Sequence, residues 1–254
     1  MEAKLLLKGL CARYEDILEE NFVGMYVHGS YAMDGFNPAK SDLDFIVVCH
    51  EVPCDSEKCA MVDATLAYMH TAPAKGLEMH LMLREDCLNF QYPPKFQLHY
   101  SPAHTDIYLQ DPYGYVGWMR GEDPDLGAHL MVMKQRGLCV KGAPLHEVFG
   151  QVPPVAYFQG ILSDLGWSEE DAMYHVLNHC RSLAYVREGR VLSKREGGLW
   201  AIEHMDKVCH PVICRALDCY AGDETMAPSP EARTFCESTL EIIKREAAGK
   251  GLLE

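Results

Sequence analysis

Apolar and polar residues alternate over several short stretches in the first part of the chain. The pattern is clearest at 77–83, where Glu78 and His80 face one way and the apolar residues beside them face the other. Residues two apart in a strand share a face, so this alternation predicts a half-buried strand. Two further apolar stretches, at about 23–28 and 43–49, predict two more strands.

Helical spacing dominates elsewhere. Apolar residues three and four positions apart predict amphipathic helices over 2–20 and 56–72, and a third helix begins at Asp125. Residues 84–118 are rich in tyrosine, proline and histidine, so we expect irregular structure with short strands there. Beyond residue 150 the pattern is helical almost throughout, with helices predicted at 154–165, 168–187, 193–204, 208–221 and 229–248.

These patterns predict two domains, with a boundary near the proline-containing stretch at 151–154, where the composition changes. Residues 1–150 are expected to form an α/β (α+β) domain with a mixed sheet, and residues 151–254 an all-α helical bundle. A chain of 254 residues is long enough for each domain to bury its own core.

The formal net charge of −14 narrows the choice of partners. An acidic surface argues against nucleic acid as the main ligand, because phosphate backbones require a basic protein surface. The charge is compatible with a cationic substrate, and solubility alone explains it equally well. The sequence has no run of about 18 apolar residues, so we expect no membrane-spanning helix.

The 11 cysteines are scattered and include no CxxC pair. With no signal peptide at the N-terminus, we expect reduced thiols in a cytoplasmic protein, which we interpret as a monomer. One group of residues comes nearest to a metal-binding cluster, namely Cys209, His210, Cys214 and Cys219. The spacings within this group match none of the usual zinc sites.

The candidate chemistry centres on residues 25–48, which are predicted to form a strand, a glycine-serine turn and a second strand. Asp42 and Asp44 point to the same side and repel one another, and a divalent cation would relieve that repulsion. Hard oxygen ligands of this kind suit Mg²⁺. Gly29 has no Cβ and lets the backbone approach a triphosphate, while Ser30 can donate a hydrogen bond to phosphate oxygens.

Glu78 supplies a third carboxylate, which can share the metal or take a proton from an attacking hydroxyl. Each feature alone has an ordinary structural explanation, such as a solvated strand end or an exposed strand face. Their joint order along the chain is far more specific, and it predicts nucleotidyl transfer from a nucleoside triphosphate.

The stretch from His28-Gly29-Ser30-Tyr31-Ala32 through Ser41-Asp42-Leu43-Asp44 resembles the signature of the polymerase-β-like nucleotidyltransferase superfamily. Other segments resemble the aminoglycoside (streptomycin/spectinomycin) adenylyltransferases, so that the resemblance covers most of the chain. These segments are Leu77-Glu78-Met79 and residues 91–98, 123–126, 140–144, 175–181 and 189–194.

The resemblance implies an O-adenylyltransferase that binds ATP and Mg²⁺ at the N-terminal domain and an antibiotic in a cleft between the domains. It assigns the metal to Asp42, Asp44 and Glu78, and it makes Glu78 the catalytic base. Basic residues of the second domain would reach the ATP phosphates, although they can also be read as surface cations on amphipathic helices. The nucleotide-binding residues are then Gly29, Ser30, Ser41, Arg181 and Lys194.

Three residues of the second domain relate to the acceptor. Asp171 corresponds to an acidic residue that is expected to touch the drug, although this acidic stretch also has the composition of a helix N-terminus with Ser168 as its cap. Trp167 is placed to stack on a sugar ring or to pack as a buried residue. Tyr174 stands where the family commonly has asparagine, a departure that affects the identity of the drug.

The favoured interpretation is transfer of AMP from ATP to a hydroxyl of spectinomycin or streptomycin, which gives antibiotic resistance. Two alternatives stay open. The same chemistry could act on a protein hydroxyl or a small metabolite, or the chain could be a nucleotide-binding regulator without transferase activity. The presence of all three carboxylates disfavours the regulator.

Overall fold

The computed structural model describes residues 2–222 and 224–253. It divides into two compact units, the first ending at Val152 and the second beginning at Pro153. Within the described part of the chain, no helix is both long and apolar enough to cross a membrane. All 11 cysteines are free thiols, buried or exposed, and none is paired in a disulfide.

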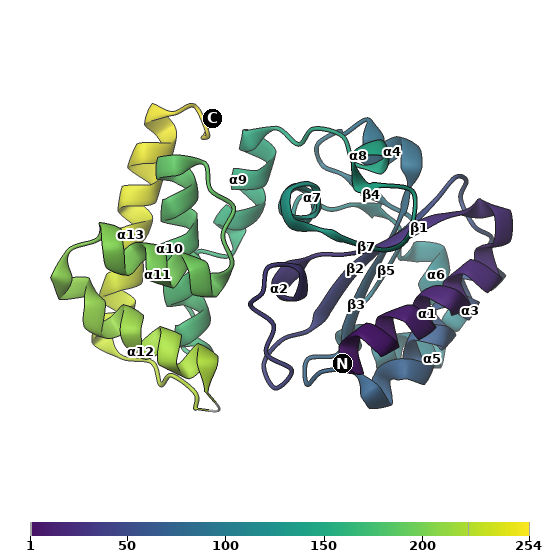
Figure 1. Cartoon of the computed structure of the whole chain (residues 1–254), viewed down its shortest axis with the longest axis horizontal. Coiled ribbons are helices and arrows are strands. Elements are labelled where there is room, and N and C mark those ends of the chain that lie inside the picture. Colours follow the sequence, from purple (N-terminus) through teal and green to yellow (C-terminus); the bar gives the residue numbers. More distant parts are fainter. Residues whose placement is uncertain (1, 223, 254) are drawn as a thin grey trace. The chain divides into compact units, whose positions relative to one another are not determined.

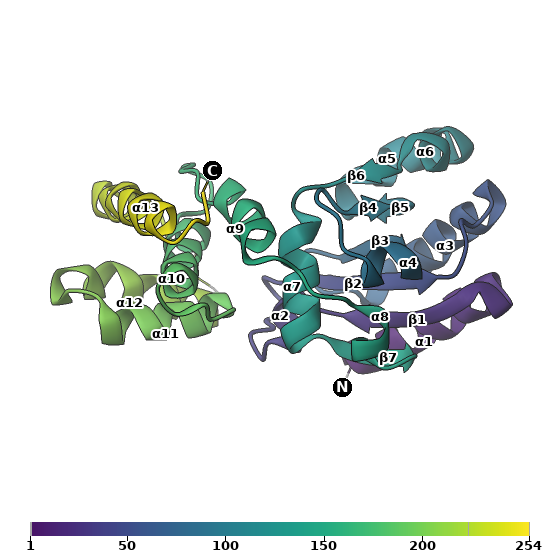
Figure 2. The same cartoon turned by 90° about the horizontal axis from the view of Figure 1, so that it is seen from above.

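The first unit is built on a five-stranded sheet with the order β5-β3-β2-β1-β7, which can be followed in Figure 2. β2 and β3 are parallel, whereas the other neighbouring strands are antiparallel, so the sheet is mixed as predicted. A parallel pair requires a crossover connection, which α3 (Asp55–Tyr68) supplies. The strands are β1 (Phe22–Val27), β2 (Leu43–Cys49), β3 (Leu77–Leu83), β5 (Leu98–Tyr100) and β7 (Leu138–Gly142).

One face of this sheet carries the hydrophobic core of the first unit. Phe45 and Val47 of β2 point into that core, where α1 (Glu2–Leu18) and α3 cover the sheet (Figure 1). Burial of apolar surface, at about 25 cal/mol per Å², is the main force that holds these layers together. Because side chains alternate along a strand, Asp44 and Glu78 project from the opposite face of the sheet.

Short elements complete the first unit, and they correct one expectation. The stretch 84–118, expected to be irregular with short strands, also contains three short helices. All three helices are too short to show an apolar period. The helix that follows Asp111 is also capped locally, because the Asp111 carboxylate accepts a hydrogen bond from the Gly114 N–H at 2.9 Å. The elements are α2 (Gly29–Ala32), α4 (Arg84–Leu88), β4 (Lys95–Phe96), α5 (Thr105–Gln110), α6 (Pro112–Trp118), β6 (Gly121–Glu122), α7 (Leu126–Arg136) and α8 (Leu145–Val148).

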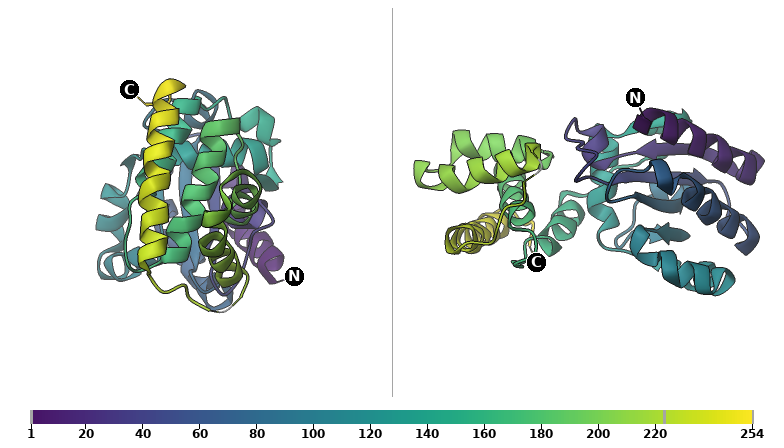
Figure 3. Two further views of the ribbon diagram at one scale, coloured as in Figure 1. Left: turned by 90° about the vertical axis from the view of Figure 1, so that its left-hand side faces the viewer. Right: turned by 90° about the horizontal axis from the view of Figure 1, so that it is seen from below.

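The second unit consists of helices, which confirms the predicted all-α character. The long helices α10 and α13 lie side by side (Figures 1 and 3). Arg187 of α10 donates hydrogen bonds to both carboxylate oxygens of Glu246 of α13, the shortest at 2.9 Å. Ser193 and Glu196 form a reciprocal capping box at the start of α11, which fixes where that helix begins. The helices are α9 (Pro154–Ser163), α10 (Ala172–Glu188), α11 (Lys194–His204), α12 (His210–Ala221) and α13 (Pro230–Gly249).

Candidate active site

Three carboxylates meet on the polar face of the sheet. Asp44 and Glu78 are direct partners in the parallel pairing of β2 with β3, and Asp42 immediately precedes β2. One carboxylate oxygen from each of Asp42, Asp44 and Glu78 lies within 4.8 Å of the other two. The three residues that the sequence singled out are therefore brought together by strand register.

This donor set fits a magnesium ion. Mg²⁺ prefers hard oxygen ligands and is usually held by one or two carboxylates, with water and substrate phosphates completing its shell. Asp42 and Asp44 are half-buried, so their carboxylates keep access to solvent and to a ligand. A cation at this point would also offset the mutual repulsion of three neighbouring negative charges.

Gly29 adjoins the carboxylates at the start of α2. Its φ of 62° lies in the left-handed region, and a Cβ built on it would collide with Oδ2 of Asp44. The N–H of His28 donates to the carbonyl oxygen of Asp44 at 3.0 Å, which fixes the turn to β2. The side-chain oxygen of Ser30 is buried and has no hydrogen-bond partner among the described residues, so it is available to a ligand oxygen.

Ser41, which was predicted to contact the nucleotide, has a structural role in the loop before β2. Its hydroxyl oxygen accepts from the N–H of Asn37 at 3.1 Å, and its own N–H donates to the carbonyl oxygen of Asn37 at 2.7 Å. The residue is 6% exposed. These bonds close the loop that delivers Asp42 to the site.

The charge state of Glu78 is set by its neighbours. Burial alone would raise its pKa, but the contact with the His99 ring and the nearby charges of His129 and His99 outweigh burial and lower the pKa. His99 Nε2 lies 3.3 Å from Glu78 Oε1. Glu78 is therefore ionised at neutral pH and can accept a proton.

His129 of α7 acts as a cation beside these carboxylates. Burial alone would lower its pKa, but the hydrogen bond to Asp125 and the charges of Asp125, Glu78 and Asp44 raise the pKa to about 9. Its Nε2 lies 3.3 Å from Asp125 Oδ2. The i,i+4 spacing of Asp125 and His129 was visible in the sequence, but it gave no reason to place the pair near Glu78.

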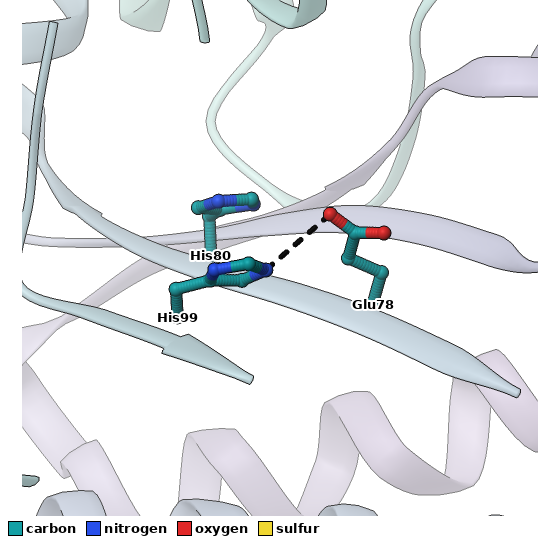
Figure 4. Close-up of side chains that lie close together, drawn as sticks. All are labelled: Glu78, His80 and His99. Atoms are coloured by element: carbon teal, nitrogen blue, oxygen red, sulfur yellow. Dashed lines mark ion pairs between the residues drawn. The ribbon is translucent and has the colours of Figure 1, made fainter. Parts of the chain in front are cut away.

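Ring contacts connect several histidines beneath the carboxylates, a cluster that the sequence did not predict. His80 and His99 stack with ring centroids 4.0 Å apart and planes 8° from parallel (Figure 4). Burial holds the pKa values of His28 and His80 well below the ordinary histidine value, so both rings are neutral. The rings in contact are those of His28, His80, His99, His104 and His129.

Glu78, His80 and His99 also bring ligand atoms within 4.8 Å of one another. A metal ion binds an imidazole nitrogen in the plane of the ring, where the lone pair lies. The planes of His80 and His99 run nearly parallel, so their lone pairs do not converge on one ion. In this arrangement His99 contacts Glu78 and His80 stacks on His99. The two histidines therefore do not chelate a metal together with Glu78.

In the second unit, a cluster of polar residues forms around Tyr174 of α10. The Nζ of Lys194 lies 4.6 Å from the centre of the Tyr174 ring, as a cation–π contact. Arg181 Nη2 lies 3.6 Å from Asp164 Oδ2. Burial, helped by the charge of Asp164, raises the pKa of Tyr174 to about 12. Asp164, which the sequence did not single out, therefore joins the predicted residues Tyr174, Arg181 and Lys194.

Asp171 and Trp167 lie near the start of the same helix. Asp171 is the N-cap of α10, and its carboxylate accepts from the N–H of Tyr174 at 3.0 Å. Ser168 instead contacts the ring of His175, so the expected cap at Ser168 was wrong and the helix starts later than predicted. Trp167 packs on His175 with ring centroids 5.6 Å apart. A contact of either residue with a drug stays a prediction.

Comparison with known proteins extends this picture. Residues 147–245 match the family model described as the C-terminal domain of aminoglycoside adenylyltransferase. A spectinomycin 9-adenylyltransferase of Campylobacter jejuni is 23% identical over 247 residues, which cover 88% of each chain. An aminoglycoside (3'')(9) adenylyltransferase of Klebsiella pneumoniae is 23% identical over 220 residues, covering 82% of this chain and 81% of the relative.

Among solved structures, the spectinomycin adenyltransferase of Enterococcus faecialis, crystallised with ATP and spectinomycin, has a TM-score of 0.75. The match covers 92% of this chain and 96% of that one at 20% identity, and it shows a common fold. These similarities identify the chain as a nucleotidyltransferase, in which a mixed sheet presents three carboxylates and a helical unit follows. Residues 147–245 match the C-terminal domain of the aminoglycoside adenylyltransferases, and the chain is similar to members of that family over most of its length.

Proposed function

We propose that this protein transfers the adenylyl group of ATP to a hydroxyl of spectinomycin or streptomycin and so confers resistance. The observation that carries the proposal is the meeting of Asp42, Asp44 and Glu78 within 4.8 Å on two paired strands. The similarity to adenylyltransferases supports the reaction type, and the names of the relatives support spectinomycin and an aminoglycoside as acceptors.

The residues of the first unit have separate roles in this proposal. Asp42 and Asp44 hold Mg²⁺, and Glu78 also contributes an oxygen ligand. The ion, when bound, supplies positive charge for the phosphates and the departing pyrophosphate. The Ser30 hydroxyl donates a hydrogen bond to a phosphate oxygen. Gly29 has no Cβ, which leaves room for the Asp44 carboxylate and lets the backbone approach the triphosphate.

Glu78 is the proton acceptor for the attacking hydroxyl. The hydroxyl oxygen forms a bond to the α-phosphorus, the bond from that phosphorus to pyrophosphate breaks, and the proton passes to the Glu78 carboxylate. Because the pKa of Glu78 is lowered, the carboxylate is ionised before the reaction begins. A hydroxyl becomes strongly acidic as its oxygen bonds to phosphorus, so a weak base suffices if it is correctly placed.

In the second unit, we assign Arg181 and Lys194 to the phosphate oxygens of ATP. Arginine suits bidentate binding of a phosphate, and lysine provides a point charge. We assign Trp167, Asp171 and Tyr174 to the acceptor. Spectinomycin and streptomycin are cations at neutral pH, and the net charge of −14 favours their approach.

The test measures the release of pyrophosphate from ATP in the presence of Mg²⁺, with one acceptor added at a time. Spectinomycin, streptomycin, hygromycin and kanamycin form the panel, and Asp44→Asn protein serves as the inactive control. We expect turnover with spectinomycin or streptomycin, and mass spectrometry should show the acceptor heavier by one adenylyl group. Absence of turnover with every member of the panel would overturn the antibiotic as acceptor and direct the search to protein hydroxyls or small metabolites.

A further inference from the structure

The catalytic carboxylate that we assign to Glu78 has one histidine partner in direct contact. His99 lies on β5 and is paired in register with His80 of β3, two residues beyond Glu78. The side chains of Glu78, His80 and His99 therefore share one face of the sheet (Figure 4). His99 Nε2 lies 3.3 Å from Glu78 Oε1, which is close enough for an ion pair when the imidazole is protonated (Figure 4).

The orientation of the His99 ring is fixed by packing. One face of the ring stacks on His80, which is 2% exposed and cannot move aside into solvent. The ring of His104 meets it edge-on, with centroids 5.1 Å apart and planes at 83°. The backbone carbonyl of His99 accepts a hydrogen bond from the hydroxyl of Tyr115, which anchors the strand end below the ring.

These contacts limit what the Glu78 carboxylate can do. A glutamate side chain has three rotatable bonds, and in solution its carboxylate samples many positions. Contact with a fixed imidazole restrains the carboxylate through Oε1, and this also limits the positions that Oε2 can take. A rate that depends on the placement of a proton acceptor falls steeply when that group is displaced by about 1 Å.

We propose that His99 is a positioning residue, which holds one oxygen of Glu78 so that the other is aimed at the acceptor hydroxyl. The proposal rests on the proposed function in one respect, namely the assignment of Glu78 as the base. The positioning role rests on the 3.3 Å contact between His99 Nε2 and Glu78 Oε1. His80, His104 and Tyr115 act on Glu78 only by holding His99.

Three substitutions at one position test the proposal. His99→Phe keeps a flat ring against His80 but removes the donor. His99→Gln places an amide nitrogen near the position of Nε2 and restores the donor, whereas the shorter His99→Asn does not reach Glu78. We expect His99→Phe and His99→Asn to lower kcat by about tenfold to a hundredfold, with the KM for ATP changed less than about twofold. His99→Gln should recover most of the loss.

His146→Phe serves as the matched control, because that side chain is 78% exposed. It should leave kcat and KM unchanged, and the melting temperatures of all variants should show that the fold is retained. Wild-type kcat in His99→Phe, or an equal loss in His99→Gln and His99→Asn, would overturn the positioning role.

Two further measurements separate this proposal from the assignment of the base. If Glu78→Gln keeps its activity, the base assignment fails, whatever His99 does. If Glu78→Gln is impaired, adding His99→Phe should cause no further loss, because His99 acts through Glu78; an additional loss contradicts the proposal. Crystal structures give a readout without turnover: Glu78 should occupy more than one rotamer in His99→Phe, and an unchanged single rotamer there would count against a positioning role.

Discussion

Asp44 of β2 and Glu78 of β3 face each other as direct partners in a parallel strand pair. Backbone hydrogen bonds along seven residue pairs hold this register, so the separation of the two carboxylates is set by the sheet rather than by flexible loops. A shift of one residue would turn one carboxylate into the apolar core. The position of the site is thereby tied to the stability of the sheet.

Replacement of Asp44 tests the metal assignment. Asp44→Asn keeps the shape of the side chain but removes its charge, and we expect kcat/KM to fall at least about a hundredfold in Mg²⁺. Isothermal titration should show weaker binding of Mg²⁺ with ATP. Asp16→Asn is the control, since that side chain is 71% exposed on α1. If Asp44→Asn protein turns over normally, the aspartate does not hold the metal.

Alanine substitutions at two glycines with similar backbone angles distinguish the effect of backbone strain from the effect of a clash with Asp44. Gly29 has a φ of 62° and Gly189 a φ of 69°, but a Cβ would meet Asp44 only at Gly29, and nothing lies within 4 Å at Gly189. Gly189→Ala should cost about 1–2 kcal/mol of unfolding free energy and keep full turnover. Gly29→Ala should cost more and also abolish turnover, because the methyl group displaces Asp44. Urea unfolding and pyrophosphate release measure the two effects, and equal behaviour of the variants would contradict the collision.

Arg181 gives a test in the second unit. If its guanidinium binds ATP phosphates, Arg181→Ala should raise the KM for ATP about tenfold to a hundredfold, since a hydrogen bond to a charged group contributes about 1.5–3 kcal/mol. Arg190→Ala is the control, because the Arg190 side chain is 55% exposed. Steady-state kinetics at varied ATP concentrations measure this KM in both variants. An unchanged KM would mean that Arg181 serves only its ion pair with Asp164.

The pH dependence of stability should reflect His179 in α10. Burial lowers its pKa from 6.5 to about 4, and its Nδ1–H donates to the carbonyl oxygen of His175 at 2.7 Å. Between these two pH values the unfolded chain binds a proton that the folded chain does not. The free energy of unfolding should therefore fall as the pH drops through this window, by up to about 3 kcal/mol from this residue.

Urea unfolding followed by circular dichroism from pH 4 to pH 8 measures this contribution. His179→Gln should remove part of the slope, while His146→Gln, at an exposed site, should leave it unchanged. The same slope in the wild type and in His179→Gln would show that another group is responsible.

The strands that carry the site were predictable because their apolar patterns are strong. Alternation at 77–83 placed Glu78 on the polar face, and the structure has β3 over the same residues. One strand and three short helices escaped for physical reasons. β7 (Leu138–Gly142) is a largely exposed edge strand without a buried face, and the helices α4, α5 and α6 are too short to show a period.

The histidine cluster could not be derived from the sequence in the same way. The alternation did place His80 beside Glu78, which was the one available signal. His99 and His129 reach the site only through the pairing of β5 with β3 and the packing of α7, which are contacts between distant segments. Local patterns determine which way a side chain faces on its own element, but not which other element it meets.

The division of the chain into two compact units after Val152 affects how the protein can evolve. Substitutions around Tyr174 alter the helical unit and leave the backbone pairing of Asp44 with Glu78 intact. If the acceptor binds around Tyr174 as proposed, a lineage can explore new acceptors through the helical unit while it inherits the carboxylate site of the first unit unaltered.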